Sequence, residues 1–168
     1  LIPAAAAESV LGKAGTEGYL LDEGKYDELL KASTVLERLG WHCYESQRTS
    51  MAWDRALEYL RDFDKEAEVY DRFLCNAYLD VRPVVSRDRQ SLWLELLYDD
   101  SRVSEVKTTS VGDGVSIQTP LKNDFRIRTS VRIPKGKMAV FVTNAPIRDG
   151  GERMLRLLVL RAGMWEDK

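Results

Sequence analysis

The sequence contains little of the chemistry that catalytic and metal-binding proteins require. It has a single histidine, His42, and two cysteines, Cys43 and Cys75, which cannot supply the ligand spacing of a zinc site. Nucleophile elbows, phosphate-binding glycine loops and dinucleotide fingerprints are also absent. Because an isolated histidine is more often a packing or surface residue than a base, we expect a protein that is not an enzyme and that uses no cofactor or metal ion.

The sequence also lacks a long hydrophobic run and a strong net charge. No stretch approaches the roughly 20 apolar residues of a membrane-spanning helix. The 25 basic and 27 acidic residues are mixed along the chain and give a formal net charge of -2, which provides no electrostatic attraction for nucleic acid or for an anionic membrane surface. We therefore expect no nucleic-acid partner, and membrane association only through a larger assembly.

The length and composition indicate one domain. A chain of 168 residues with 44% hydrophobic side chains can build one core but not two comfortable ones. Residues 1–18 are rich in alanine and glycine, so we expect residues 1–20 to form a flexible arm outside the core and residues 21–168 to form the domain. The opening alanine-rich stretch is typical either of the region beside a removed export signal or of a flexible linker.

Residues 22–39 show the spacing of an amphipathic helix. Glu23 lies in the first turn and Gly40 terminates the pattern. The apolar residues recur every three or four positions: Tyr26, Leu29, Leu30, Val35, Leu36 and Leu39. A short strand is expected at 41–47. Residues 50–70 are ambiguous, because their apolar side chains also recur at helical spacing, and periodicity alone favours a helix there.

From Arg72 onward the sequence is plainly that of β-strands. Apolar and polar side chains alternate along 77–83, 92–98 and 125–133, as in strands with two different faces. Further strands are expected at 102–110, 115–119, 138–143 and 154–161, and Asp113-Gly114 is a typical hairpin turn. Because the connections are too short for parallel crossovers, we predict an α+β fold that is mainly β, with one N-terminal helix followed by an antiparallel β-meander.

The two cysteines allow a disulfide. Cys43 and Cys75 both fall in predicted strands, where a cross-strand disulfide is geometrically allowed. Two reduced, buried thiols that act as small hydrophobic side chains fit the sequence at least as well.

Exposed arginine and tryptophan side chains are the candidates for an interface. Arg126, Arg128 and Arg132 share one face of a predicted strand, which suits an anion or a charged interface, although opposed acids such as Glu95, or solvent, also explain them. Trp165, in the charged tail, is a candidate for contact with a partner or with its own domain.

Two acidic groups offer the oxygen ligands that calcium prefers. The groups are Asp62, Asp64, Glu66 and Glu68 on the one hand, and Asp99 and Asp100 on the other. Neither has the ligand spacing of a known calcium loop, so we interpret both as solvated acidic segments.

Several motifs resemble the conserved core domain of bacterial secretins and secretin-like envelope proteins. Residues 79–86, Leu-Asp-Val-Arg-Pro-Val-Val-Ser, followed by Leu-Trp-Leu-Glu-Leu at 92–96, look like a hairpin of that family. Residues 128–140, which contain the Pro-Lys-Gly-Lys turn, look like its strand-turn-strand, and 157–162 occupies the place of its closing strand. The similarity spans about residues 25–162 and is fainter in the first half.

The resemblance implies a structure for the ambiguous region. It implies a β-ribbon with strands at about 49–53 and 55–62, and we adopt that interpretation because tertiary pairing often overrides weak helix propensity. The family's glycine pair is replaced at 142–145, and long alternating segments that could serve as membrane hairpins are missing. The resemblance therefore implies a scaffold more than a channel.

On this basis we expect a non-catalytic structural subunit, exported to the periplasm or outer membrane of a bacterium. It would pack with copies of itself and with other envelope proteins into a ring or scaffold, through sheet edges or strand pairing. The candidate interface residues are Trp53, Arg126, Arg128 and Trp165. The alternative is a small monomeric β-domain that holds a peptide or glycan partner.

Overall fold

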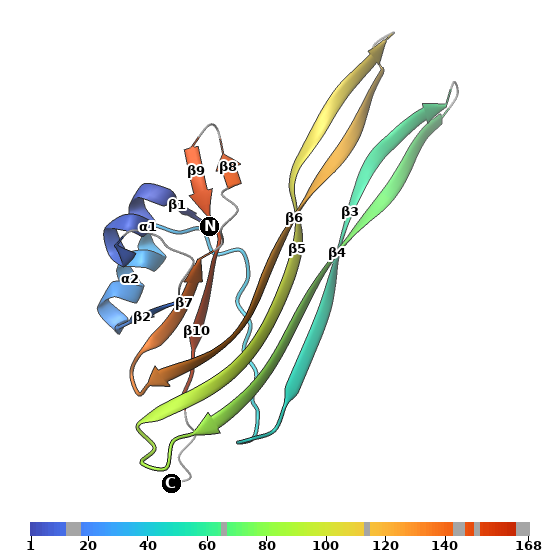
Figure 1. Cartoon of the computed structure of the whole chain (residues 1–168). Coiled ribbons are helices and arrows are strands. Elements are labelled where there is room, and N and C mark those ends of the chain that lie inside the picture. The colour runs from blue at the N-terminus through green and yellow to red at the C-terminus, as the bar shows by residue number, and fades with distance from the viewer. Residues whose placement is uncertain (13–17, 65–66, 113–114, 143–146, 150–151, 164–168) are drawn as a thin grey trace. The chain divides into compact units, whose positions relative to one another are not determined.

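The computed structural model describes residues 1–12, 18–64, 67–112, 115–142, 147–149 and 152–163 (Figure 1). Along these residues the elements follow in the order β1 (Ile2–Pro3), α1 (Ala4–Leu11), β2 (Tyr19–Leu21), α2 (Glu23–Lys31), β3 (Thr49–Asp64), β4 (Ala67–Val85), β5 (Ser91–Gly112), β6 (Val115–Pro134), β7 (Met138–Val142), β8 (Ile147–Asp149), β9 (Glu152–Leu155) and β10 (Leu157–Arg161). The described part of the chain is mainly β, with two short helices and antiparallel sheets, as the sequence predicts.

These elements form two compact units. The first consists of Leu1–Thr49, Val81–Leu96 and Thr129–Lys168, and the second of Ser50–Asp80 and Leu97–Arg128. The strands β4, β5 and β6, and β3 through its first residue Thr49, contribute residues to both units, because the boundary falls within them.

The core of the first unit forms where α1 and α2 pack with two small sheets, of strand order β1-β9-β8 and β10-β7-β2. The central strand β7 pairs antiparallel with β10 on one side and with β2 on the other. All five of its residues, Met138–Val142, are buried. A short continuous apolar run of this kind is the pattern of a strand that is covered on both faces.

The N-terminal residues belong to this core. Ile2 and Ala7 have no exposed surface, and they join a cluster made of Ile2, Ala4, Ala7, Leu21, Leu29, Val140, Val142 and Leu155. The prediction that the first residues lie outside the core is therefore wrong for residues 1–12, whereas 13–17 lie outside the described residues. The small side chains of α1 are three positions apart on one helical face, which lets this helix approach its neighbours closely.

The predicted helix is shorter than its periodicity suggests. It begins after Asp22, whose carboxylate accepts a hydrogen bond from the Lys25 N–H at 3.0 Å, and this bond lowers the pKa of Asp22. It ends at Lys31, and the Thr34 N–H then donates to the Leu1 carbonyl at 2.7 Å. This long-range bond replaces a further helical turn.

Residues 34–48 form neither the remainder of the predicted helix nor the strand predicted at 41–47. Their apolar side chains Val35, Leu36 and Leu39 are 50%, 43% and 40% exposed. Helices in proteins are stabilised mainly by packing of an apolar face. No described surface buries this stretch, so its periodicity alone does not extend the helix.

The four long strands form one sheet of order β3-β4-β5-β6, which Figure 1 shows as the two long hairpins β3–β4 and β5–β6. The β interpretation of residues 50–70 is confirmed, although Thr49–Asp64 is one continuous strand and not two. The strands predicted separately at 92–98 and 102–110 are both part of β5, so this strand is longer than predicted. The turn predicted at Asp113-Gly114 lies outside the described residues.

Alternating burial gives the sheet of the second unit a covered face and an exposed face. On β4, Cys75, Ala77 and Leu79 are buried, and the side chains between them are exposed. On the covered face, the rings of Tyr98 and Phe125 meet edge to face with centroids 5.9 Å apart, an arrangement that aromatic pairs prefer. The alternation that predicted strands at 77–83 and 125–133 therefore also predicted which face most side chains occupy, with the buried Asp80 as an exception.

Helices long and apolar enough to span a membrane are not found among the described residues.

Candidate assembly interface

Two long strands form the outer edges of the four-stranded sheet. In its order, β3 and β6 each have one neighbour. The 16 residues of β3 include no proline, glycine or lysine, so charged side chains are the remaining feature of this edge that discourages another strand from pairing with it. The strand β6 carries Pro120 and Lys122 near its start but has no proline from Leu121 to Ile133.

The Leu60 backbone shows which groups of β3 point to the outer edge. Its N–H donates to Oε1 of Gln118 in β6 at 3.0 Å, so this N–H does not serve the ladder with β4. Because backbone groups alternate in direction along a strand, the N–H groups of the even-numbered β3 residues point outward. The bond brings the two edge strands within side-chain reach of each other inside one chain at this point, although β3 and β6 do not pair as strands.

Side-chain contacts within the second unit define which positions share a face. Arg55 of β3 reaches Asp100 of β5 on the covered face, so the even-numbered positions of β3 lie on the exposed face with Asp99. Arg126 of β6 binds Asp99 on that exposed face. The even-numbered positions of β3 and β6 therefore share one face of the sheet, at its two opposite edges.

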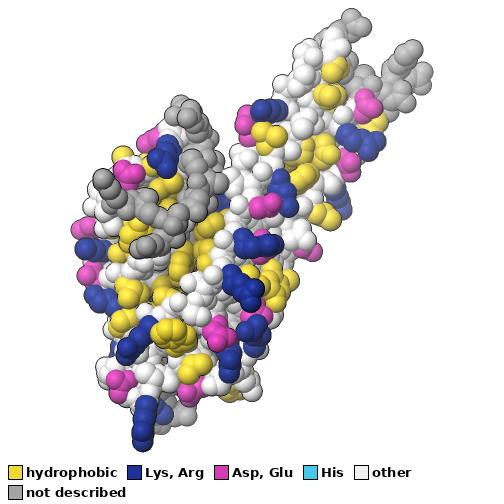
Figure 2. Space-filling model, in the orientation of Figure 1, with side chains coloured by type: hydrophobic (Ala, Val, Ile, Leu, Met, Phe, Trp, Pro, Cys, Tyr) yellow, Lys and Arg dark blue, Asp and Glu magenta, His cyan; other side chains and the backbone are white. Residues whose placement is uncertain are grey.

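Charges of opposite sign lie at these two edges. The charged even-numbered β3 residues whose side chains are described are acidic and exposed: Asp54, Glu58 and Asp62. The exposed charged residues at even positions of β6 are Lys122, Asp124, Arg126, Arg128 and Arg132, of which only Asp124 is acidic. Figure 2 shows basic and acidic side chains spread along the long strands. The exposed face is thus acidic along β3 and basic along β6.

Three of these charges, Glu58, Lys122 and Asp124, are neutralised by neighbours on their own side of the sheet. The guanidinium of Arg72 donates to Glu58 through Nε at 3.0 Å and Nη2 at 2.9 Å. The Lys122 amine lies 3.0 Å from Asp124, and this contact lowers the pKa of Asp124. Because each of these charges is paired within its own chain, it attracts a charged partner less strongly.

Asp54 and Arg128 differ from their neighbours, because neither forms a hydrogen bond or ion pair within the described part of the chain. Arg126, two residues earlier on the same face, is paired with Asp99 and not with Glu95, the acid that the sequence suggested. One unpaired acid on β3 and one unpaired base on β6 therefore remain on the exposed face.

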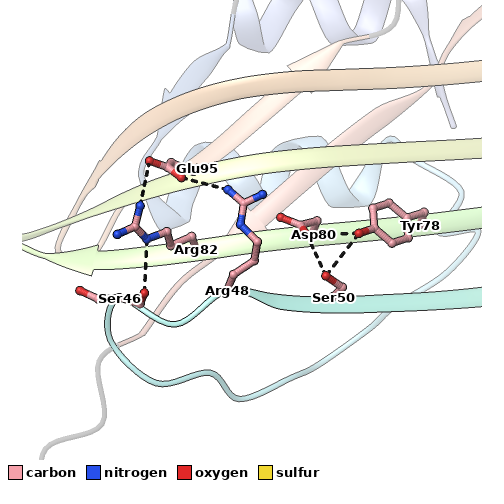
Figure 3. A network of polar contacts seen from close by, with 7 residues as sticks. All are labelled: Ser46, Arg48, Ser50, Tyr78, Asp80, Arg82 and Glu95. Carbon is pink, nitrogen blue, oxygen red and sulfur yellow. Dashed lines mark hydrogen bonds and ion pairs between the residues drawn. The ribbon is translucent and has the colours of Figure 1, made fainter.

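In the first unit, Glu95 of β5 is shared by two arginines (Figure 3). Arg48 Nη2 and Arg82 Nη1 lie 3.3 and 3.7 Å from its carboxylate oxygens. Arg82 Nε also donates to the Ser46 carbonyl at 3.3 Å. These contacts fasten the segment before β3 to β4 and β5.

In the second unit, hydroxyl groups satisfy the carboxylate of Asp80, which is only 7% exposed. The Ser50 hydroxyl donates to Asp80 at 2.8 Å, and the Tyr78 hydroxyl lies 3.2 Å from the same oxygen (Figure 3). Buried carboxylates require such donors, so the start of β3 is held to β4 by side chains as well as by its ladder.

The most deeply buried charge of the second unit is Asp100, at 1% exposed. Arg55 Nη1 lies 2.9 Å and Arg102 Nε 2.7 Å from its two carboxylate oxygens. Burial, together with the charge of Asp100, raises the pKa of Tyr98 to about 12. Because Arg55 lies on β3 and Asp100 on β5, the cluster ties together two strands that are separated by β4.

Trp53, an expected interface residue, lies on the covered face and is partly buried. The guanidinium carbon of Arg55 is 5.6 Å from the centre of its ring, and its Nε1 is buried without an acceptor among the described residues. It is therefore not grouped with Arg126 and Arg128, which are exposed on the other face. The remaining interface candidate, Trp165, lies outside the described residues.

The disulfide that the sequence allowed is not formed. Cys43 and Cys75 are both free thiols. Cys43 lies in the segment without regular structure and not in a strand, and its partial burial raises its pKa. Cys75 is buried on β4 of the second unit, as the alternative interpretation expected, whereas Cys43 is only partly buried.

The two acids at 99 and 100 point to opposite faces of β5. Asp99 binds Arg126 and Asp100 binds Arg55, so they cannot share a cation. Along the described ranges, no three histidine, cysteine or acidic side chains are close enough to hold a metal ion. The side chains at 64 and 66 lie outside the described residues, and His42 is exposed.

The sequence reasoning missed one residue of this surface and misplaced a buried one. Asp54 was overlooked because residues 50–70 also fit a helix, whereas one strand from 49 to 64 places Asp54 and Glu58 on the same face. Asp100 was grouped with Asp99 because the two are adjacent in sequence, although adjacent strand residues face opposite ways.

Comparison with known proteins adds no relative: no protein-family model, curated protein or solved structure matches this chain.

Proposed function

We propose that this chain is a non-catalytic structural subunit that assembles side by side with copies of itself into a ring or scaffold of the bacterial envelope. The observation that carries the proposal is the edge strand β3, with 16 residues and no proline, glycine or lysine. Such an edge invites pairing with another strand. Its length, at about 3.3 Å per residue, is roughly 50 Å.

The strand count supports assembly with identical copies. In an antiparallel meander of four consecutive strands, the first and last strands run in opposite directions. The β6 strand of one copy and the β3 strand of the next can therefore continue the antiparallel pattern while every copy points the same way. Such a head-to-tail contact closes into a ring if the rotation between copies allows it.

The envelope location rests on the resemblance to secretin-like proteins. The residues that carry it, 79–86, 92–96 and 128–140, lie in β4, β5, β6 and β7, except Ser86 and the turn at 135–137.

The test is the native mass of the purified protein, measured by light scattering after size exclusion at several concentrations. We expect multiples of 19.2 kDa that increase with concentration. A monomer at every concentration would contradict self-assembly. It would favour the second candidate, a monomeric β-domain whose β3 edge binds an extended peptide by adding a strand.

A further inference from the structure

We infer that the contact between copies is set by charge, with Asp54 on β3 of one copy opposite Arg128 on β6 of the next. This inference rests on the proposed assembly and specifies its register. Both residues are exposed on the same face of the second unit, and neither has a partner in its own chain within the described residues. Directly opposed residues of an antiparallel pair share a face, so the two can meet in a continued sheet.

This register is compatible with the other residues along both edges. It places Leu57 opposite Phe125 on the covered face, an apolar pair of the kind that stabilises neighbouring strands. It also places Glu58 opposite Asp124, but each of these acids is already paired, with Arg72 and Lys122 respectively. The charges that are free to form new pairs are therefore the ones that the register joins.

The occupant is a second copy because the two edges complement each other. The exposed face is acidic along β3 and mainly basic along β6. A contact of β3 with β3, or of β6 with β6, would bring like charges together and is disfavoured. The head-to-tail contact is the arrangement in which both edges gain opposite charges.

The decisive experiment reverses one charge at a time and then mixes the variants. In Asp54→Lys every contact has two bases, and in Arg128→Glu every contact has two acids. Opposed strand pairs contribute up to about 1 kcal/mol and like pairs cost a similar amount, so the concentration at half-assembly should rise roughly tenfold in each variant. Light scattering measures this concentration.

An equal mixture of the two variants should assemble to within about threefold of the wild type. In alternating copies, the lysine introduced on β3 of one variant meets the glutamate introduced on β6 of the other, and the native pair forms at the next contact. Such rescue requires two chains. The matched controls Asp27→Lys and Arg87→Glu make the same charge changes at exposed positions outside both edges, and they should assemble like the wild type.

The outcomes separate the inference from the proposed function. A wild-type chain that stays monomeric overturns both. Wild-type assembly together with unaffected single variants, or with no rescue in the mixture, overturns the inference and leaves the proposed function standing.

A cysteine crosslink tests the register independently of charge. The same register places Ala56 opposite Arg126. A variant with Ala56→Cys and Arg126→Cys, in which Cys43→Ser and Cys75→Ala remove the native thiols, should therefore form disulfides between copies when oxidised. These disulfides should appear as a ladder of covalent oligomers on a non-reducing gel. The control variant Ala52→Cys/Arg126→Cys has its first cysteine displaced by about 13 Å along β3. It should give at least tenfold less covalent oligomer. An Ala56/Arg126 product that migrates as a monomer would show that β3 and β6 meet within one chain, and it would overturn the inference.

Discussion

At the scale of single residues, the second unit depends on a buried anion held between two cations. Asp100 is 1% exposed, whereas the side chains of Arg55 and Arg102 are 27% and 17% exposed. Desolvation of a carboxylate is costly unless its oxygens are paired. Both oxygens are paired here, so the cluster can fix the relative positions of β3 and β5.

Removing this anion should destabilise the protein far more than removing its neighbour. Asp100→Ala leaves Arg55 and Arg102 partly buried without their shared partner, and we expect a loss of about 3–5 kcal/mol in the free energy of unfolding. Asp99→Ala breaks only the surface pair with Arg126, which should cost less than about 1 kcal/mol. Denaturant titration of both variants checks the difference, and equal losses would show that the cluster has no special role.

The residue scale also shows where sequence reasoning succeeds for the candidate site. The alternation in 125–133 placed Arg126 and Arg128 on an exposed face, and they are exposed. The partner of each side chain across neighbouring strands could not be predicted in the same way. Which acid faces Arg126 depends on the register between β5 and β6, and the observed register places Asp99 there and not Glu95. Register is a tertiary property, and a shift along a strand changes every partner.

At the scale of elements, the outer edge of β3 is the feature on which the proposed assembly depends. The N–H groups of its even-numbered residues point away from β4, as the Leu60 bond to Gln118 indicates. Proline removes the backbone donor and is tolerated on edge strands only where that donor faces outward. The two kinds of position can therefore be separated by substitution.

Ala56→Pro should block assembly while the single chain remains folded. The control at the adjacent position, Leu57→Pro, removes a backbone N–H that donates a hydrogen bond to β4. We expect that control to lower the free energy of unfolding by about 2 kcal/mol more than Ala56→Pro does. Thermal unfolding and light scattering are measured on the same samples. Normal assembly of Ala56→Pro would exclude β3 strand pairing as the contact.

Element type was predictable where one pattern dominated and unpredictable where two patterns competed. Residues 125–133 alternate cleanly and lie in β6. Residues 50–70 fit a helix by spacing, yet pairing with neighbouring strands makes them β. The opposite error occurred at 34–39, where the helical spacing predicts a helix that does not form. No described part of the chain buries the apolar side chains of this segment. Local periodicity specifies a structure only when the fold provides a surface for it.

At the scale of the whole molecule, a nearly neutral chain carries a separation of charge. The net charge of -2 and the even mixture of acids and bases along the sequence suggest no electrostatic partner. The separation arises because the acidic face of β3 and the basic face of β6, far apart in sequence, become the two edges of one sheet. Composition alone cannot reveal attraction between copies, because it does not show where the charges lie in the fold.

If this separation drives assembly, salt should weaken it. The distance over which charges act falls from about 10 Å at 0.1 M to about 3 Å at 1 M ionic strength, so the concentration at half-assembly should rise several-fold over that range. The neutral variant Asp54→Asn/Arg128→Gln should assemble more weakly at 0.1 M and should lose most of this salt response. Apolar burial responds in the opposite direction, because salts that are excluded from protein surfaces strengthen it. Assembly that is unchanged or stronger at 1 M salt would therefore mean that the contact is made by apolar side chains of the covered face, and that the charges at the two edges serve only to keep the chain soluble.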